Sequence, residues 1–144
     1  MTITINRIHI CITILLCFLL IPQTLTAQTE KDITAINEIG LLYYNSGNYS
    51  EAINEFKKIL RIKPDHDVAH FNLGCVYEKM KQYEASMNEF QEVLNVIPDD
   101  GEAKSKIQKM ARQWASNIKI DLETNPADPE LRCNMGICHL YLGE

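Results

Sequence analysis

The chain has 144 residues, of which 46% are apolar, 23% charged and 8% aromatic, and its formal net charge at pH 7 is -5. This composition is that of an ordinary globular protein, so it excludes the collagen-like and intrinsically disordered classes. A net-acidic chain lacks the excess of Lys and Arg that neutralises phosphates, so we expect no nucleic-acid partner.

The first 27 residues are predicted to be an export signal. An apolar run over residues 8–21 follows a segment whose one charge is Arg7, and this run is too short to span a bilayer comfortably. A polar stretch with small residues then ends at Ala27, where we place the cleavage site. The exported chain, periplasmic or secreted, would begin at Gln28 and meet the membrane only during export. An uncleaved membrane anchor is the alternative, because one basic residue is few for a signal and Leu25 is bulky near the cleavage site.

A 34-residue repeat organises the chain that follows, since residues 33–66 align with residues 67–100 without a gap. The identical pairs are Ala35/Ala69, Gly40/Gly74, Tyr43/Tyr77, Tyr49/Tyr83, Asn54/Asn88, Glu55/Glu89, Phe56/Phe90, Leu60/Leu94, Pro64/Pro98 and Asp65/Asp99. These identities predict two copies of one structural unit.

Each unit is predicted to be a pair of antiparallel helices. In the first unit, apolar residues recur at three- and four-residue steps on both sides of a break at residues 45–47. Asn48, with Glu51 three residues later, is expected to cap the second helix, and Pro64 to end it.

Gly40 and Gly74 fall in the middle of the first helices, where glycine costs about 1 kcal/mol relative to alanine. Such a cost implies a packing reason. We expect the second helix to cross so closely that a Cβ would collide, with Ala52 or Ser86 as the small residue opposite.

The residues at fixed places in both units resemble the tetratricopeptide repeat family. They are Ile39, Gly40, Tyr43, Ala52, Phe56 and Pro64 in the first unit, and Leu73, Gly74, Tyr77, Ser86, Phe90 and Pro98 in the second. The signature Trp of that family is replaced by Ile36 and His70. The resemblance implies an all-α fold, an α-solenoid of antiparallel helix pairs wound into a superhelix, and a protein or peptide as partner.

Residues 101–128 form a degenerate, shortened unit, which is predicted to be one long helix or a shortened helix pair. Its apolar stripe is expected to be core and comprises Ile107, Met110, Trp114, Ile118 and Leu122.

A further, truncated unit is predicted over residues 129–144. Asp128 and Pro129 supply a helix start, and Gly136 and Gly143 match Gly74 and Gly47 of the earlier units. The apolar side chains of this helix have no second helix to cover them. We therefore expect the chain to be incomplete, or this end to fray, self-associate or be covered by another molecule.

Two groups of residues suggest cofactor chemistry, and we expect neither to perform it. Cys133, Cys138 and His139 form a lengthened relative of the haem-attachment spacing, but they fall on repeat positions that call for small or core-facing residues. His66 and His70 are four residues apart, as in a metal pair, but His66 is predicted to precede the helix and His70 to face the core. With Cys75 the exported part holds three cysteines, an odd number that suggests no disulfide framework.

No nucleophile elbow and no glycine-rich phosphate loop occur in the sequence, so we expect no cofactor, no metal and no enzymatic activity. The clamp of Lys, Asn and Arg with which some members of the family grip chaperone tails is also missing. Of its positions, which read Asn37, Leu41, Asn72, Glu102 and Lys106, the only match is Asn72.

The resemblance implies a partner-binding concave face on the first helices. Its residues are Thr34, Asn37, Leu41, Tyr44, Val68, Phe71, Cys75 and Glu78, with Asn72 as a polar neighbour. Tyr44 is expected to be exposed. Leu41 and Phe71 either contact the partner or, as the alternative, pack against the following unit. The predicted function is an exported scaffold for protein or peptide binding. The alternatives are the N-terminal repeat region of a longer enzyme or assembly factor, and a c-type haem module.

Overall fold

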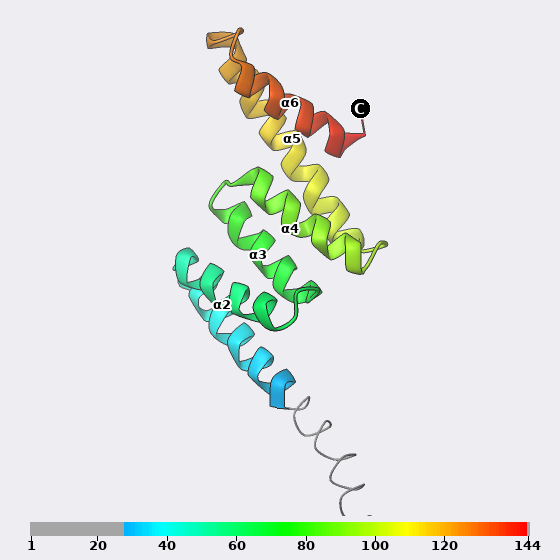
Figure 1. The fold of residues 1–144 in the computed structure, drawn as a ribbon. Helices are drawn as coiled ribbons and strands as arrows, with labels where there is room; N and C mark the ends of the chain where they lie inside the picture. Colours follow the sequence, from blue (N-terminus) through cyan, green and yellow to red (C-terminus); the bar gives the residue numbers. More distant parts are fainter. Residues whose placement is uncertain (1–27, 144) are drawn as a thin grey trace, which may run out of the picture. The chain divides into compact units, whose positions relative to one another are not determined.

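The computed structural model describes residues 28–143, and the predicted export signal lies outside them. The described residues fall into two units, 28–36 and 37–143, and residues 28–36 are helical. In the second unit, helical residues 37–45 are followed by α2 (Tyr49–Ile62), α3 (Asp67–Lys79), α4 (Tyr83–Val96), α5 (Gly101–Thr124) and α6 (Pro129–Leu142) (Figure 1). The prediction of an all-α fold is confirmed for the described residues. None of their helices is both long and apolar enough to cross a membrane.

Helices that follow one another in the chain pack against one another, α2 on α3, α3 on α4, α4 on α5 and α5 on α6. Short turns connect them, and Figure 1 shows α3 and α4, and then α5 and α6, running side by side in opposite directions. One core cluster lies between α4 and α5 and consists of Met87, Phe90, Val93, Ala103, Ile107, Met110 and Ala111.

The first helix of each pair ends in a left-handed turn residue at the same repeat position. This residue is Gly47 with φ 80°, Lys81 with φ 60° and, after α6, Gly143 with φ 72°. Glycine adopts this conformation without a Cβ clash, whereas Lys81 bears its cost of about 1 kcal/mol. The shared turn marks α6 as the structural counterpart of α3.

The prediction that the Asn48 side chain caps α2 was wrong. Asn48 occupies the N-cap position, but its side chain makes no capping hydrogen bond. Side chains do cap three later helices: His66 accepts from a backbone N–H of α3, Asp100 from one of α5, and Asp128 from two of α6. Pro64 follows the end of α2 at Ile62, as expected.

Phenylalanine rings explain the two mid-helix glycines. A Cβ built on Gly40 would lie 2.6 Å from Cε1 of Phe56, and one built on Gly74 would lie 2.9 Å from Cζ of Phe90. Both rings are fully buried. The glycine therefore makes room for the ring that holds the two helices of a pair together.

The atoms that a Cβ on either glycine would meet belong to the rings rather than to Ala52 or Ser86. Ser86 nevertheless lies opposite Gly74, as expected. Ser86 contributes in another way, since its Oγ donates a hydrogen bond of 2.6 Å to the Gly74 carbonyl oxygen. A small residue at this place lets the two helix backbones approach closely enough for that bond.

The shortened unit forms one long helix, α5, rather than a helix pair. Along its apolar stripe Ile107, Met110 and Ile118 are buried, while Trp114 and Leu122 are half-buried. In α6, by contrast, Cys138 is the one fully buried residue. The last helix thus contributes little to the core and keeps much of its surface open.

Candidate partner-binding surface

Of the predicted binding residues, Thr34 and Val68 are exposed. The others lie along helix 37–45 and α3, and every one of those is half-buried. They are Asn37, Leu41, Tyr44, Phe71, Asn72, Cys75 and Glu78. The expectation that Tyr44 is exposed was therefore wrong. Its ring packs at 6.0 Å from the ring of Tyr49 at the start of α2.

Two asparagines join the first helices of the two repeat units. Nδ2 of Asn72 donates to Oδ1 of Asn37 at 2.8 Å. Within the described residues, Nδ2 of Asn37 and Oδ1 of Asn72 have no further partner. The pair thus presents both a donor and an acceptor of the kind that a peptide backbone requires.

Phe71 packs against the second repeat unit, which is the alternative role considered for it. Its ring meets that of Phe90 edge to face, with centroids 5.2 Å apart. Phe71 and Cys75 both pack partly buried against the core cluster between α4 and α5. The apolar middle of the predicted surface is therefore continuous with the core.

Two lysines of α5 complete the surface, and sequence reasoning missed their role. Nζ of Lys106 donates to Oε2 of Glu78 at 2.7 Å, and Nζ of Lys109 donates to Oε1 at 3.3 Å. We call the surface made by Asn37, Leu41, Tyr44, Asn72, Cys75, Glu78, Lys106 and Lys109 the first-helix face. The repeat breaks down at α5, so no repeat register was available with which to place these lysines opposite Glu78.

Burial and ion pairing act against each other in this polar cluster. Burial alone would raise the pKa of the Glu78 carboxyl, but the hydrogen bonds and charges of Lys106 and Lys109 outweigh it, so its pKa lies below its ordinary value. For Lys106, burial lowers the pKa, but Glu78 together with the nearby Cys75 and Tyr44 raises it by more, so the pKa of Lys106 lies above its ordinary value. Burial also raises the pKa of the neighbouring Cys75 thiol and Tyr44 hydroxyl.

The Glu78 ion pairs predict a pH dependence of stability. A carboxyl whose pKa is lowered on folding stabilises the fold above its unfolded pKa of about 4.3, and this contribution is lost as the pH falls through the folded pKa. Glu78→Gln should lower the free energy of unfolding by about 1 kcal/mol at neutral pH, and by less below pH ~4. Urea unfolding at several pH values measures this, with the solvent-exposed Glu51→Gln as control. An equal loss at pH 3 and pH 7 would contradict the ion-pair account.

Acidic residues gather where α3 and α5 begin. Asp67, Asp100 and Glu102 line a hollow of about 210 Å³ together with the apolar side chains Val68, Phe71 and Val93. Along α3 the surface thus changes from this acidic hollow near Asp67 to the lysines that hold Glu78. A ligand lying along α3 would meet charges of opposite sign at its two ends.

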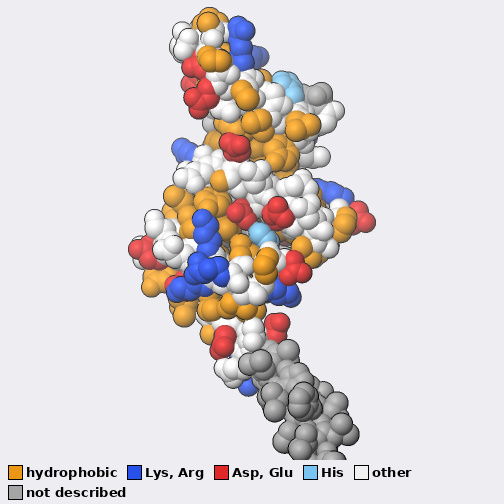
Figure 2. Space-filling view, viewed as in Figure 1, with side chains coloured by type: hydrophobic (Ala, Val, Ile, Leu, Met, Phe, Trp, Pro, Cys, Tyr) orange, Lys and Arg blue, Asp and Glu red, His pale blue; other side chains and the backbone are white. Residues whose placement is uncertain are grey.

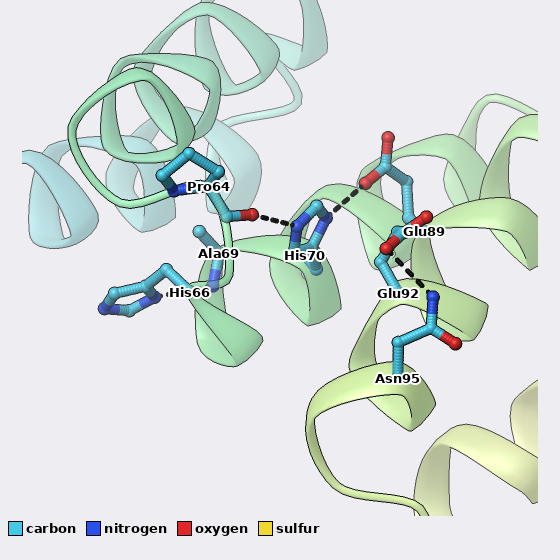
Figure 3. A network of polar contacts seen from close by, with 7 residues as sticks. All are labelled: Pro64, His66, Ala69, His70, Glu89, Glu92 and Asn95. Atoms are coloured by element: carbon cyan, nitrogen blue, oxygen red, sulfur yellow. Dashed lines mark hydrogen bonds and ion pairs between the residues drawn. The ribbon is translucent and has the colours of Figure 1, made fainter.

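The two histidines that suggested a metal pair have separate structural roles (Figure 3). Nδ1 of His66 accepts from the Ala69 backbone N–H at 3.1 Å and caps α3. His70 bonds through Nε2 to the Pro64 carbonyl oxygen and through Nδ1 to Glu89, each at 2.8 Å. His70 therefore ties the turn before α3 to α4.

The cysteines of α6 are not presented together. Cys133 is exposed and Cys138 is buried, and both are free thiols, as is Cys75. A haem attached through two thioether bonds needs both sulfur atoms on one accessible side. The structure therefore does not bring these two residues together for that purpose.

Two antiparallel helix pairs, each closed by a phenylalanine over a glycine, place the chain in the class of helical repeat proteins. The family model described as TPR repeat matches residues 40–81, and the one described as Tetratricopeptide repeat matches residues 68–100. Residues 40–100 of the chain are tetratricopeptide repeats, as the two repeat signatures predicted.

Solved structures of tetratricopeptide domains share this fold. The first such domain of Spaghetti (RPAP3), bound to the HSP90 peptide SRMEEVD, is 18% identical, with a TM-score of 0.53 over 79% of this chain and 95% of that one. The domain of Arabidopsis OM64 is 9% identical, with a TM-score of 0.55 over 76% and 96%. A Parabacteroides merdae repeat protein is 20% identical, with a TM-score of 0.52 over 77% of this chain and 46% of its own. No curated protein sequence matches the chain.

Proposed function

We propose that the protein is a non-enzymatic scaffold that binds a protein or peptide on its first-helix face. The observation that carries the proposal is the Asn37–Asn72 pair, which leaves a backbone-type donor and acceptor on that face. The fold adds support, since the Spaghetti domain of the same fold is bound to a peptide.

The face has the parts that recognition of an extended segment requires. The asparagines offer hydrogen bonds to its backbone, and Leu41 and the Tyr44 ring offer apolar contact. The acidic hollow near Asp67 and the lysines beside Glu78 differ in charge, which would fix the direction of the bound segment. The polar contacts of this face are one hydrogen bond between two amides and two Lys–Glu ion pairs, and the proposal includes no catalytic step.

Tyr44→Ala should weaken binding by more than about 1 kcal/mol, because aromatic side chains dominate such interfaces. Peptides selected from a displayed library on the wild-type protein provide the ligand, and calorimetry with wild type and variant measures the loss. Cross-linking and affinity capture with the protein identify the natural partner.

Two further variants control this measurement. Tyr44→Phe keeps the half-buried ring and should bind nearly as wild type, while Lys57→Ala changes an exposed residue of α2 outside the face. Equal affinity of wild type, Tyr44→Ala and Lys57→Ala would remove the support for this face as the binding surface.

We also propose that the protein is exported and cleaved after Ala27, on the strength of the apolar run over residues 8–21 and the polar segment after it. Intact-mass measurement of the protein from the producing cells should find a chain that begins at Gln28. A chain that retains Met1 and sediments with membranes would instead identify an uncleaved anchor.

A further inference from the structure

The acidic hollow, which adjoins the first-helix face along α3, has walls of two chemical kinds. Its lining side chains are the apolar Val68, Phe71 and Val93 and the acidic Asp67, Asp100 and Glu102. Val68 is 46% exposed, so apolar surface stands open at this place. The volume of about 210 Å³ leaves room for one long side chain. A side chain that fits here is apolar along its length and positively charged at its end.

The acids of this hollow are not neutralised by the described part of the chain. Glu78, farther along α3, is held by two lysines, whereas Asp67 and Glu102 form no ion pair within residues 28–143. On the face of the molecule in Figure 2, basic and acidic side chains are interspersed. The charged side chains that line the hollow are all acidic. A bound cation would therefore meet carboxylates that have no competing lysine or arginine.

Acids in the first turn of a helix also have a structural use, because the partial positive charge of a helix N-terminus favours them. Asp67 and Glu102 are the first-turn acids of α3 and α5, just as Glu51 is that of α2 and Glu84 that of α4. This use explains each acid by itself. It does not explain why two of the four meet, together with Asp100, around one open apolar hollow.

Lysine and arginine are the side chains that match both walls. Each has an apolar stem that packs along apolar surface and a cationic end that only donates hydrogen bonds. The stem would lie against Val68 and Phe71, and the cation between the carboxylates of Asp67 and Glu102. An acidic segment would instead bring like charges together, which disfavours it.

Helix α3 also sets the spacing along a segment that follows it. Val68 and Asn72 are four residues apart, or about 6 Å along the helix axis. An extended chain advances about 3.3 Å per residue. The basic residue would therefore lie about two residues from the one whose backbone bonds to the Asn37–Asn72 pair.

We propose that the acidic hollow binds a lysine or arginine side chain of the partner's extended segment, so that the first-helix face selects basic segments over acidic ones. This proposal rests on the function proposed above, because it specifies which segment binds to that face. The occupant is a segment of a partner protein, and its recognition combines one cation in the hollow with backbone hydrogen bonds at the asparagines.

Peptides selected from a displayed random library on the full chain test the proposal. They should share a Lys or Arg at one fixed position, and replacing it by Gln in a synthetic peptide should weaken binding about fivefold. Asp67→Asn/Glu102→Gln should weaken the basic peptide to a similar extent and leave the Gln peptide unaffected. The acidic peptide SRMEEVD, which the Spaghetti domain binds, should bind at least about tenfold more weakly than the selected peptide.

Glu51→Gln/Glu84→Gln is the matched control, because it removes two first-turn acids that lie outside the hollow. It should bind the basic peptide nearly as wild type does. Selected peptides that lose affinity with Tyr44→Ala but show no basic preference would overturn this proposal and leave the proposed function standing. No peptide binding at all, to a chain that circular dichroism shows to be folded, would overturn both.

Urea unfolding of the same variants tests whether the chain fills the hollow itself. The two double variants should have similar midpoints, because both lose two first-turn acids. A clearly lower midpoint for Asp67→Asn/Glu102→Gln would show that a cation of the chain's own holds these carboxylates, and would overturn the proposal of a partner's side chain there.

Discussion

Gly74→Leu is expected to lower the free energy of unfolding by about 3 kcal/mol. Even a bare Cβ at this position would lie 2.9 Å from Cζ of Phe90, and leucine adds three more carbons towards the same ring. The ring has little room to move, because Phe90 is fully buried and meets Phe71 edge to face. Overpacking of this kind outweighs the helix-propensity gain of about 1 kcal/mol on replacing glycine.

Urea unfolding followed by circular dichroism measures this loss. Gly101→Leu provides the matched control, since Gly101 is also helical but a Cβ there would meet no atom within 4 Å. The control should keep or raise the stability. An unchanged midpoint for Gly74→Leu would show that α3 and α4 are not packed through this glycine.

The repeat was readable from sequence because its signals are local or recur at a fixed spacing. Gly40 and Gly74 indicated a close contact by their position in a helix, and the 34-residue period placed Phe56 and Phe90 in register with them. Ser86 lies opposite Gly74 as expected, but the rings that fill the space over the glycines were not predicted to do so. Sequence spacing gives the helix face of a residue but not how far its side chain reaches across the interface, and a phenylalanine ring reaches farther than a methyl group.

The first-helix face was less predictable, because its polar contacts join segments far apart in the chain. Asn37, Asn72 and Glu78 were predicted from their repeat positions. The hydrogen bond between Asn72 and Asn37 and that between Lys106 and Glu78 depend on how neighbouring helices cross. The exposure of Tyr44 was misjudged for the same reason. Its ring packs against Tyr49, which belongs to the next helix.

The contrast between Gly74 and Gly136 was also beyond the sequence. Both glycines occupy the same place in the repeat, and sequence comparison treats them alike. The structure separates them by what a Cβ would meet, a ring in one case and open space in the other. Within residues 28–143, α4 thus lies over Gly74 and no helix lies over Gly136, so two glycines at the same repeat position have different surroundings.

Phe90→Ala is expected to have the largest effect, a loss of about 3–5 kcal/mol in the free energy of unfolding. Its ring is fully buried, fills the space over Gly74 and belongs to the core cluster between α4 and α5. Removal of the ring leaves a cavity against Phe71 and the glycine, so the transfer and cavity costs add.

The double variant Gly74→Leu/Phe90→Ala tests whether Gly74 and the Phe90 ring share one space or whether any change in this helix pair is destabilising. If the ring and the glycine share one space, the leucine of the double variant fills the cavity that the lost ring leaves. Its loss should then fall short of the sum of the two single losses by more than about 1 kcal/mol. Urea unfolding of all four proteins under one set of conditions gives this coupling energy. Strictly additive losses would mean that the introduced leucine and the Phe90 ring do not compete for the same volume, and would contradict the account in which Gly74 makes room for Phe90.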